Sequence, residues 1–452
     1  MNKREYDIIV IGVGPAGFCC GVAAARMGKE VLMIEASDSI LGNITGGPLE
    51  AIMTFHDESR QVIKGIPDEF VRRCVEIGGS LGHVNDTIGY AKTITPFSPE
   101  ICKYVGYTML KEENMKVLTQ ACLLDCMVDK RKIESVRISS KNETRVYKAK
   151  VFVDCTGDGD LAVLAGCGYA MGDVDGNIQP MTSLMQLGGV DNICLANWVL
   201  KHPEEFKFFS QDALLEIAEG IRSFANQAMH LWGFYSLLKD GFEKGALSLN
   251  RREMHLITGP HPNQVIINYS RYSGNPLNMD DRSDAQAETV IQGYRLWKWL
   301  KENNGAFKDS WIEKIGKIGI RESRRINGYY QMTKEGLETG RVMEHPIAIG
   351  SFPIDIHSPR GNSMEYQRLN KGCQIPWESL VTKDIDNLLC AGRCICCTHE
   401  AQGSIRITAT AMATGAGAGI GAALVCNENV ACIGLDYELL RQALELNNMI
   451  IK

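Results

Sequence analysis

Apolar and polar residues follow one another in a pattern that predicts strands and helices in alternation. Residues 7–12 form an apolar run that predicts a buried parallel strand, and the small-residue stretch 15–27 predicts a closely packed helix after it. A second apolar run at 30–35 completes a strand–helix–strand unit of the usual length. Amphipathic spacing predicts two further helices, at 68–77 and 99–113. The N-terminal part is therefore predicted to be α/β.

Short strands are predicted next. Alternating apolar residues place them at 116–118, 122–130, 132–139 and 147–154. The Gly-rich segment 41–48 predicts a loop.

The middle of the chain has a different composition from its two ends. Residues 172–384 carry more aromatic residues, histidines and prolines, with one predicted helix at 285–303, and from residue 385 an apolar strand and a small-residue helix return. This pattern predicts one discontinuous α/β domain of Rossmann type with an inserted α+β substrate or cap domain. The predicted domains are 1–171 with 385–452, and 172–384; residues 48–98 are expected to cover the cavity.

The amino-acid composition disfavours some classes of binding partner and indicates a cellular compartment. The 452 residues are too many for one ordinary core. The formal net charge is −6 and no basic run is present, which disfavours nucleic acid and anionic membranes as partners. No signal peptide is recognisable at the N-terminus, so we expect a cytoplasmic protein whose 16 cysteines are mostly buried thiols. Residues 407–426 could span a bilayer by length, but their Ala, Gly and Thr content favours a buried helix.

Three glycines carry the first functional signal. Gly12, Gly14 and Gly17 stand in G-x-G-x-x-G spacing between the first strand and the first helix, and Glu35 ends the second strand. Gly12 permits a tight turn, Gly14 lets a pyrophosphate approach the backbone, and Gly17 allows close helix–strand packing. The helix N-terminus attracts phosphate, and the acidic residue suits a ribose diol. This context predicts a dinucleotide site, but does not separate NAD from FAD.

Two later segments extend the signal. Residues 151–160 and 388–406 each predict a strand followed by a loop with backbone N–H groups, and the second is predicted to continue into a helix starting near Gly403. Open α/β sheets bind ligands at such strand ends. The combined motifs resemble the FAD-dependent oxidoreductases, and more narrowly a bacterial group related to the glutathione-reductase-like flavoproteins. They are GxGPAG (12–17), Glu35, LGNITGG (41–47), CTGDGD (155–160), GIRESRRINGYY (319–330) and AGRCICCTHEAQGSIR (391–406).

The resemblance implies a role for each matching position. The implied pyrophosphate contacts are Gly12, Gly14, Pro15, Ala16 and Gly17. The adenosine side is implied to use Glu35, Ala36, Ala121 and Cys122. The flavin side is implied to use Gly42, Asn43, Ile44, Thr45, Thr156, Gly157, Asp158, Gly392, Arg393, Ser404, Ile405 and Arg406. The helix start at 404–406 would place N–H groups at the flavin O2. Covalent relatives attach flavin through a His in the 41–47 loop; none is present here, so we expect non-covalent FAD.

Three residues are candidates for catalysis or substrate binding. His399 lies between the third strand end and the predicted helix, and either contacts substrate or anchors the loop. His357 ends an alternating strand in the inserted region, which the resemblance places near the substrate cavity. Arg321 could clamp a carboxylate or hydroxyl group if residues 321–325 form a strand; the alternative is a structural ion-pair network. His255 and His261 flank a turn, and a surface position is expected for both.

Neither a metal site nor a redox disulfide is predicted. Cysteines 390, 394, 396 and 397 lack ligand spacing, and the disulfide-reductase C-x-x-x-x-C is missing from residues 41–47. Gly415, Gly417, Gly419 and Gly421 lie in a helical pattern and indicate tight packing in preference to a second nucleotide loop.

The sequence leaves three functions open. The first is an FAD-dependent dehydrogenase or reductase that transfers hydride between flavin N5 and a small polar metabolite. The second is a flavin monooxygenase using NAD(P)H, although only one dinucleotide loop is evident. The third is an RNA-modifying flavoprotein, which the acidic balance disfavours.

Overall fold

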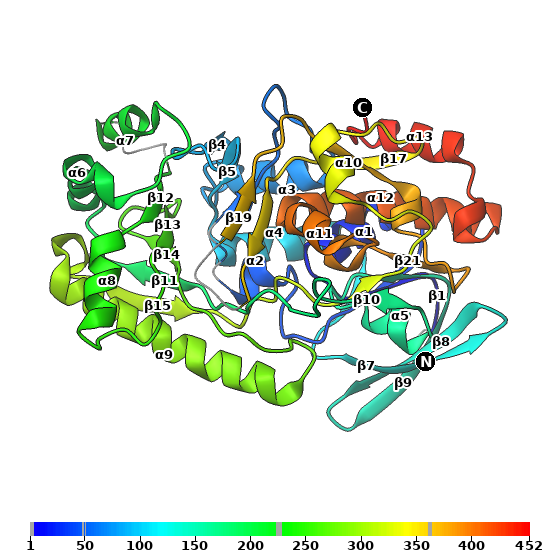
Figure 1. The fold of residues 1–452 in the computed structure, drawn as a ribbon. Coiled ribbons are helices and arrows are strands. Elements are labelled where there is room, and N and C mark those ends of the chain that lie inside the picture. The colour runs from blue at the N-terminus through cyan, green and yellow to red at the C-terminus, as the bar shows by residue number, and fades with distance from the viewer. Residues whose placement is uncertain (1–3, 48, 50, 223–227, 360–363) are drawn as a thin grey trace.

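A seven-stranded sheet forms the centre of the fold (Figure 1). The computed structural model describes residues 4–47, 49, 51–222, 228–359 and 364–452. The strand order is β6-β2-β1-β9-β8-β7, with β21 added beside β9. The bounds are β1 (Glu5–Ile11), β2 (Val31–Ile34), β6 (Lys116–Leu118), β7 (Cys122–Asp129), β8 (Lys132–Ser140), β9 (Glu143–Asp154) and β21 (Leu388–Cys390). The predicted α/β class and each strand of this sheet are confirmed.

The sheet brings four strand ends to one edge. β1 pairs in parallel with β2 and with β9, in the register Ile8↔Val31 and Ile8↔Val151. β21 also pairs in parallel with β9, although it lies more than 200 residues further along the chain. Because parallel strands end at the same edge, the loops after β1, β2, β9 and β21 meet there. β7 and β8 form an antiparallel hairpin that continues through β9.

Two small-residue helices pack against each other beside the sheet. α1 (Pro15–Arg26) and α12 (Thr408–Glu428) are in extensive contact, and α12 also contacts β9, β1 and β17 (Pro346–Gly350). A Cβ on Gly415 would lie 2.0 Å from the Ala16 carbonyl oxygen, and one on Gly419 2.2 Å from that of Cys20. The glycine run therefore serves helix packing, as predicted. α12 is long and apolar enough to cross a membrane, but 89% of its most apolar stretch is buried inside the protein.

Shorter elements surround this core. The helices are α2 (Asn43–Gly46), α3 (Ile66–Glu76), α4 (Pro99–Glu112), α5 (Asp160–Leu164), α10 (Lys334–Thr339), α11 (His399–Ile405) and α13 (Tyr437–Leu446), with 3-10 turns η3 (Trp377–Ser379), η4 (Gly392–Cys394) and η5 (Cys432–Gly434). The strands pair as β3 (Ile52–Met53), β4 (Val84–Asn85) and β5 (Thr93–Thr95); β10 (Tyr169–Ala170) and β16 (Arg325–Ile326); β17 and β20 (Cys373–Pro376); β18 (Ile354–His357) and β19 (Met364–Gln367). The predicted helices α3 and α4 are confirmed, and the loop predicted at 41–48 contains the helical turn α2; residue 48 lies outside the described residues.

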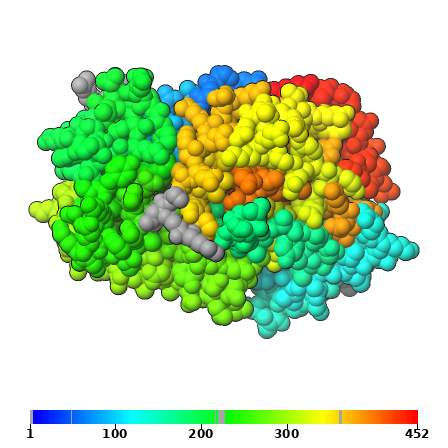
Figure 2. Space-filling model, viewed as in Figure 1, coloured from blue at the N-terminus to red at the C-terminus, as the bar shows by residue number. Residues whose placement is uncertain are grey.

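A second sheet forms the centre of the middle region. Its order is β12-β13-β14-β11-β15. The middle residues, green in Figures 1 and 2, occupy the left of the view. The bounds are β11 (Met185–Gly188), β12 (His230–Gly233), β13 (Met254–Thr258), β14 (Val265–Asn268), β15 (Trp311–Ile315), α6 (Asn192–Lys201), η1 (Pro203–Glu205), α7 (Ala213–Arg222), α8 (Tyr235–Glu243), α9 (Met279–Asn303) and η2 (Gly305–Phe307). We call residues 185–315 the cap.

Helix α9 starts six residues before its predicted start. The Asn278 side chain accepts hydrogen bonds from the N–H groups of Asp280 and Asp281, and these two acidic residues occupy the first turn. An Asn cap and early carboxylates both stabilise a helix N-terminus. The acidic, polar first turn lacks apolar periodicity, so the pattern alone placed the start too late.

Buried side chains fall into separate groups for the two regions. One group comes from β11–β15 and the cap helices. Another joins both ends of the chain and includes Ile347, Ile354, Ile375 and Trp377. The domain division of the sequence analysis stays a prediction, and this packing supports counting residues 346–381 with the two chain ends.

Candidate functional site

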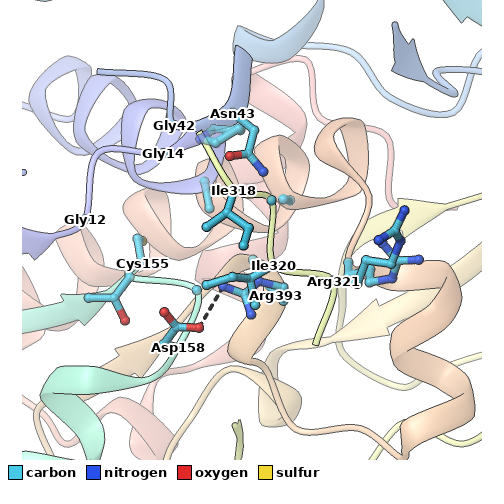
Figure 3. Close-up of a pocket in the computed structure, with 18 of the residues that line it drawn as sticks. Gly12, Gly14, Gly42, Asn43, Cys155, Asp158, Ile318, Ile320, Arg321 and Arg393 are labelled. Carbon is cyan, nitrogen blue, oxygen red and sulfur yellow. Dashed lines mark hydrogen bonds and ion pairs between the residues drawn. The ribbon is translucent and has the colours of Figure 1, made fainter. Parts of the chain in front are cut away.

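The glycine loop lies where β1 meets α1 (Figure 3). Gly12 has φ +86°, and a Cβ there would lie 2.5 Å from the Cys155 carbonyl oxygen. A Cβ on Gly17 would lie 1.9 Å from the Gly12 carbonyl oxygen, so Gly17 serves packing. A Cβ on Gly14 would meet no atom within 4 Å. Gly14 precedes α1 without any side-chain cap, so the first-turn N–H groups face open space.

Glu35 holds the loop in place from the end of β2. Its Oε2 accepts a hydrogen bond from the Val13 N–H at 2.7 Å. Its Oε1 accepts from the N–H and the Oγ of Ser37, at 2.8 and 2.7 Å. The carboxylate is thus fixed in position while the residue still lines the cavity described below.

The loop after β9 contains two aspartates in different environments. Asp154 is fully buried and accepts hydrogen bonds from Thr156 and from the Ala162 N–H, and burial raises its pKa to about 6. Asp158 accepts from Arg393 at 2.8 Å and from the Ser323 Oγ at 2.6 Å (Figure 3). Burial opposes ionisation of Asp158, but the Arg393 charge and these hydrogen bonds lower its pKa overall. Asp158 therefore links the loop after β9 to the loop after β21.

The helix that starts at the cavity is α12, not the one predicted near Gly403. Gly403 lies inside α11, which begins at His399, with the Thr398 side chain accepting from the Ala401 N–H. The chain then turns at Arg406, and α12 begins at Thr408. Arg406, Ile407, Thr408 and Ala411 line the cavity. The prediction was wrong because Thr398 caps a short helix that the small-residue pattern did not reveal.

One cavity of about 1380 Å³ runs from the glycine loop to the cap. The predicted residues on its wall are Gly12, Gly14, Pro15, Ala16, Glu35, Ala36, Gly42, Asn43, Ala121, Cys122, Thr156, Gly157, Asp158, Arg321, His357, Gly392, Arg393 and Arg406. Ala51, Met53 and Tyr90 from the segment expected to cover the cavity also line it. Residues far apart in sequence are therefore brought together around a single space.

Six predicted residues do not line this cavity. Ile44 and Thr45 are buried in and beside the turn α2, where the Thr45 Oγ1 donates to the Ile40 carbonyl and its own carbonyl accepts from Lys314 of β15. The Ser404 Oγ donates to the Phe352 carbonyl at 2.5 Å, and Ile405 is buried in the core. Gly17 and His399 are the other two.

His399 contacts the buried carboxylate of Glu322 and does not line the cavity. Its Nδ1 lies 2.7 Å from Glu322 Oε1, and Arg325 Nη1 donates to the same oxygen at 2.5 Å. The residues from Arg321 to Arg324 are irregular, since only Arg325 and Ile326 form strand β16, so the strand considered for residues 321–325 does not occur. Arg321 consequently lines the cavity while Arg325 is directed to Glu322.

A second polar group, which we call the cap-end cluster, lies at the other end of the cavity. It comprises Arg271, Arg321, Asp355, His357 and Arg406. His357 Nδ1 accepts from Arg271 Nη2 at 2.8 Å, and its Nε2 lies 3.3 Å from Asp355 Oδ2. Because arginine only donates, the ring proton of neutral His357 sits on Nε2. Arg406 Nη2 lies 3.4 Å from the same Asp355 oxygen.

Two groups of the cap-end cluster, His357 and Asp355, have shifted pKa values. Burial lowers the pKa of His357 well below its ordinary value, and the charges of Arg271 and Arg321 add to this, although Asp355 opposes it. Burial opposes ionisation of Asp355, but His357, Arg406 and Arg321 hold its pKa well below the usual range. His357 is therefore neutral and both of its nitrogens are occupied, while Asp355 is charged.

The expectation that His255 lies on the surface is wrong. His255 belongs to the buried strand β13 and lines the cavity. Its ring packs on Trp232 with centroids 4.2 Å apart and contacts Tyr90 at 6.1 Å. The sequence MHLIT offered a signal, since an apolar strand pattern flanks this histidine. His261 is exposed, as expected.

The cavity fits an FAD molecule that extends from the glycine loop toward the cap-end cluster. The open space at Gly14 and the uncapped first turn of α1 suit a pyrophosphate. The N-terminus of α12 offers N–H groups further along the same wall. All sixteen cysteines are free, and no grouping of metal-binding side chains occurs within the part of the chain that the structure describes.

The sequence is similar to those of known proteins. The sequence model of the family described as FAD dependent oxidoreductase matches residues 7–444. The soluble pyridine nucleotide transhydrogenase of Marinomonas sp. is 47% identical over 45 residues, 10% of this chain and 10% of that protein. The tRNA uridine 5-carboxymethylaminomethyl modification enzyme MnmG of Streptococcus pneumoniae is 28% identical over 204 residues, 42% of this chain and 29% of that protein. The chain thus spans less than a third of either relative.

One solved structure can be superimposed on nearly the whole chain. A geranylgeranyl bacteriochlorophyll reductase-like protein from Thermoplasma acidophilum superimposes with a TM-score of 0.46 at 12% identity, covering 98% of this chain and 83% of that one.

Proposed function

Because the chain belongs to the family of FAD-dependent oxidoreductases, we propose that this FAD enzyme transfers hydride between the flavin and a small polar metabolite. The observation that carries the proposal is the single cavity, which joins the dinucleotide loop to the buried polar cap-end cluster. A cofactor and a substrate that share one cavity can be held in direct contact, as hydride transfer requires.

The residues proposed to hold FAD follow the wall of the cavity. Gly12, Gly14, Pro15 and Ala16 would contact the pyrophosphate, and Glu35, Ala36, Ala121 and Cys122 the adenosine. Gly42, Asn43, Thr156, Gly157, Asp158, Gly392 and Arg393 would line the path to the flavin, with the N–H groups of α12 at the pyrimidine ring in place of those of Ser404, Ile405 and Arg406. When bound, the flavin supplies a two-electron acceptor or donor at N5.

The proton of the reaction is proposed to reside on His255. Oxidation of a carbon beside a hydroxyl or amine releases a proton from the heteroatom, and a neutral imidazole can accept it. Burial lowers the pKa of His255 well below its ordinary value, and His230, Arg251 and His357 add to this while Asp355 opposes it. Both nitrogens of His357 are already occupied, so His357 is proposed to position Asp355 and Arg271, and His399 to anchor α11 through Glu322.

Replacing His255 with glutamine is expected to lower kcat about 10²- to 10³-fold, since a positioned general base contributes an effect of that size. In the wild type, activity should fall only at acid pH, below the ordinary histidine range, because the neutral ring is the active form and burial lowers its pKa. The variant should lose this acidic limb while KM changes little. The matched control is His261→Gln, an exposed histidine of the same region; equal losses in both variants would contradict the assignment.

Anaerobic reduction of the bound flavin tests the proposed reaction. Candidate metabolites are mixed with the enzyme without oxygen, and bleaching of the flavin absorption identifies a hydride donor. NAD(P)H-dependent oxygen consumption coupled to substrate hydroxylation would favour a monooxygenase instead. Tight, salt-sensitive retention of bulk transfer RNA on a filter would favour an RNA-modifying enzyme. Non-covalent attachment of FAD and a cytoplasmic location stay predictions.

A further inference from the structure

We propose that the cap-end cluster binds the carboxylate of a small organic acid, which would make the substrate an anion. The inference deepens the proposed function, on which it rests only for calling that acid the substrate. It rests on the charges of the cap-end cluster, on its unpaired hydrogen-bond donors and on its position at the cavity.

The cap-end cluster contains more positive than negative charge. Arg321 is buried, Arg271 and Arg406 are half-buried, and Asp355 is the carboxylate that His357 and Arg406 contact. His357 adds no charge, because both its hydrogen bonds fit the neutral ring. Burial and the charges of Arg251 and Arg321 lower the pKa of Arg271, although arginine stays protonated in proteins. Such a group is costly unless an anion compensates it.

The nearby carboxylate of Glu322 does not compensate this charge. It is fully buried and bonded to Arg325 Nη1 at 2.5 Å and to His399 Nδ1 at 2.7 Å. Its second oxygen accepts from the Gln179 N–H at 3.2 Å. Glu322 therefore forms its own pair with Arg325 and does not neutralise the arginines of the cap-end cluster.

Unsatisfied donors surround the same place. Arg271 Nη1, Arg406 Nε and Gln179 Nε2 are buried and have no hydrogen-bond partner among the residues that the structure describes. Buried polar groups in proteins nearly always have a partner, so three such donors together indicate a group that the protein binds. Small rotations of the guanidinium planes would direct these donors at an acceptor in the cavity.

Arg321 and Arg406 are placed to meet that acceptor. Both line the cavity together with His255, His357 and Asp355. Arg321 is held by its Nη1, which donates to the Pro180 carbonyl at 2.7 Å and to the Thr182 Oγ1 at 2.5 Å. Arg406 is held by Asp355 and directly precedes α12. Two guanidinium groups that line the same cavity suit the binding of a carboxylate, since each offers paired N–H donors.

The presence of Asp355 selects a carboxylate over a phosphate. Asp355 is ionised, and its Oδ1 is buried without a partner among the described residues. A phosphate dianion beside this oxygen would meet strong repulsion, whereas a carboxylate carries a single negative charge. A carboxylate with an adjacent hydroxyl or amino group suits the cluster best, because that group can donate toward Asp355 and lies within the reach of His255.

Titration of the FAD-loaded enzyme with matched pairs of ligands tests this inference. The probes are carboxylates of two to six carbons, each with its neutral amide, such as lactate with lactamide; sulfate and phosphate serve as inorganic anions. Binding is read from the shift in Tm and from perturbation of the flavin spectrum. At least one carboxylate should bind saturably, with its amide at least ten times weaker, while Arg406→Gln and Arg321→Gln weaken the carboxylate about 10- to 100-fold.

Controls keep the outcome interpretable. Arg72→Gln removes an arginine from the exposed surface and should bind like the wild type. FAD content is measured first; if Arg406→Gln loses FAD, Arg406→Lys and Arg321→Gln decide. Carboxylates that bind no better than their amides, inorganic anions that bind equally well, or unchanged binding in the arginine variants would overturn the inference. Flavin bleaching by a neutral metabolite alone would also overturn it but leave the proposed function standing. Carboxylate binding without any flavin reduction would do the reverse.

Discussion

Replacing Gly14 with alanine is expected to abolish FAD binding at micromolar cofactor while the protein stays folded. The backbone of Gly14 has φ −66°, which alanine adopts freely, and the added Cβ would meet no protein atom within 4 Å. In the proposed site, the FAD pyrophosphate approaches the first turn of α1 through that space. A methyl group there should weaken FAD at least about 100-fold, equal to about 3 kcal/mol.

The ratio of flavin to protein, together with circular dichroism, checks this expectation. Gly305→Ala is the matched control, since Gly305 lies in the cap and a Cβ there would touch only the Cys194 sulfur at 3.9 Å. A Gly14→Ala protein that retains FAD as tightly as Gly305→Ala would show that the cofactor does not approach this loop. A Gly14→Ala protein that does not fold would contradict the finding that a Cβ at this position meets no protein atom.

Replacing Gly415 with valine is expected to prevent stable folding. Its Cβ would lie 2.0 Å from the Ala16 carbonyl oxygen, and the atoms it meets belong to the backbone of α1, which cannot rotate away. The two helices would have to separate along their whole contact, which exceeds the usual 1–3 kcal/mol of overpacking and should reach about 4 kcal/mol or more.

Soluble yield and the thermal unfolding midpoint measure this effect. Gly434→Ala is the control, because its nearest contact would be the Val430 Cβ at 3.9 Å. A Gly415→Val protein with the Tm of the control would contradict the close approach of α1 and α12. Because α1 also carries the glycine loop, partial separation should release FAD before the protein unfolds.

Local patterns predicted the cofactor end of the molecule well. Gly12, Gly14 and Glu35 lie in one strand–helix–strand unit, so spacing along the chain reports directly on their proximity. The role of the glycine run that begins at Gly415 was also predicted correctly, because small residues at helical spacing indicate close helix packing. The family of the chain then follows from motifs spread over residues 7–444.

The cap end of the cavity was harder to predict, for physical reasons. His255 reaches the cavity only because β13 pairs with β12 and β14, and such contacts leave no local spacing signal. The side chains of Arg321 and Arg325 lie in different surroundings because residues 321–324 do not form a regular strand. An irregular backbone leaves no periodic pattern in the sequence. His399 is held by a hydrogen-bonded contact with Glu322, 77 residues away in the sequence, which no local pattern reveals.

The visible absorption spectrum of the purified protein, before and after acid precipitation, tests the central claim most directly. We expect absorption bands near roughly 375 and 450 nm, which are typical of any oxidised flavin. Acid precipitation should release one FAD per chain into the supernatant. Colour retained in the precipitate would contradict non-covalent binding. A colourless protein that cannot be reconstituted with FAD would contradict the assignment of the cavity itself.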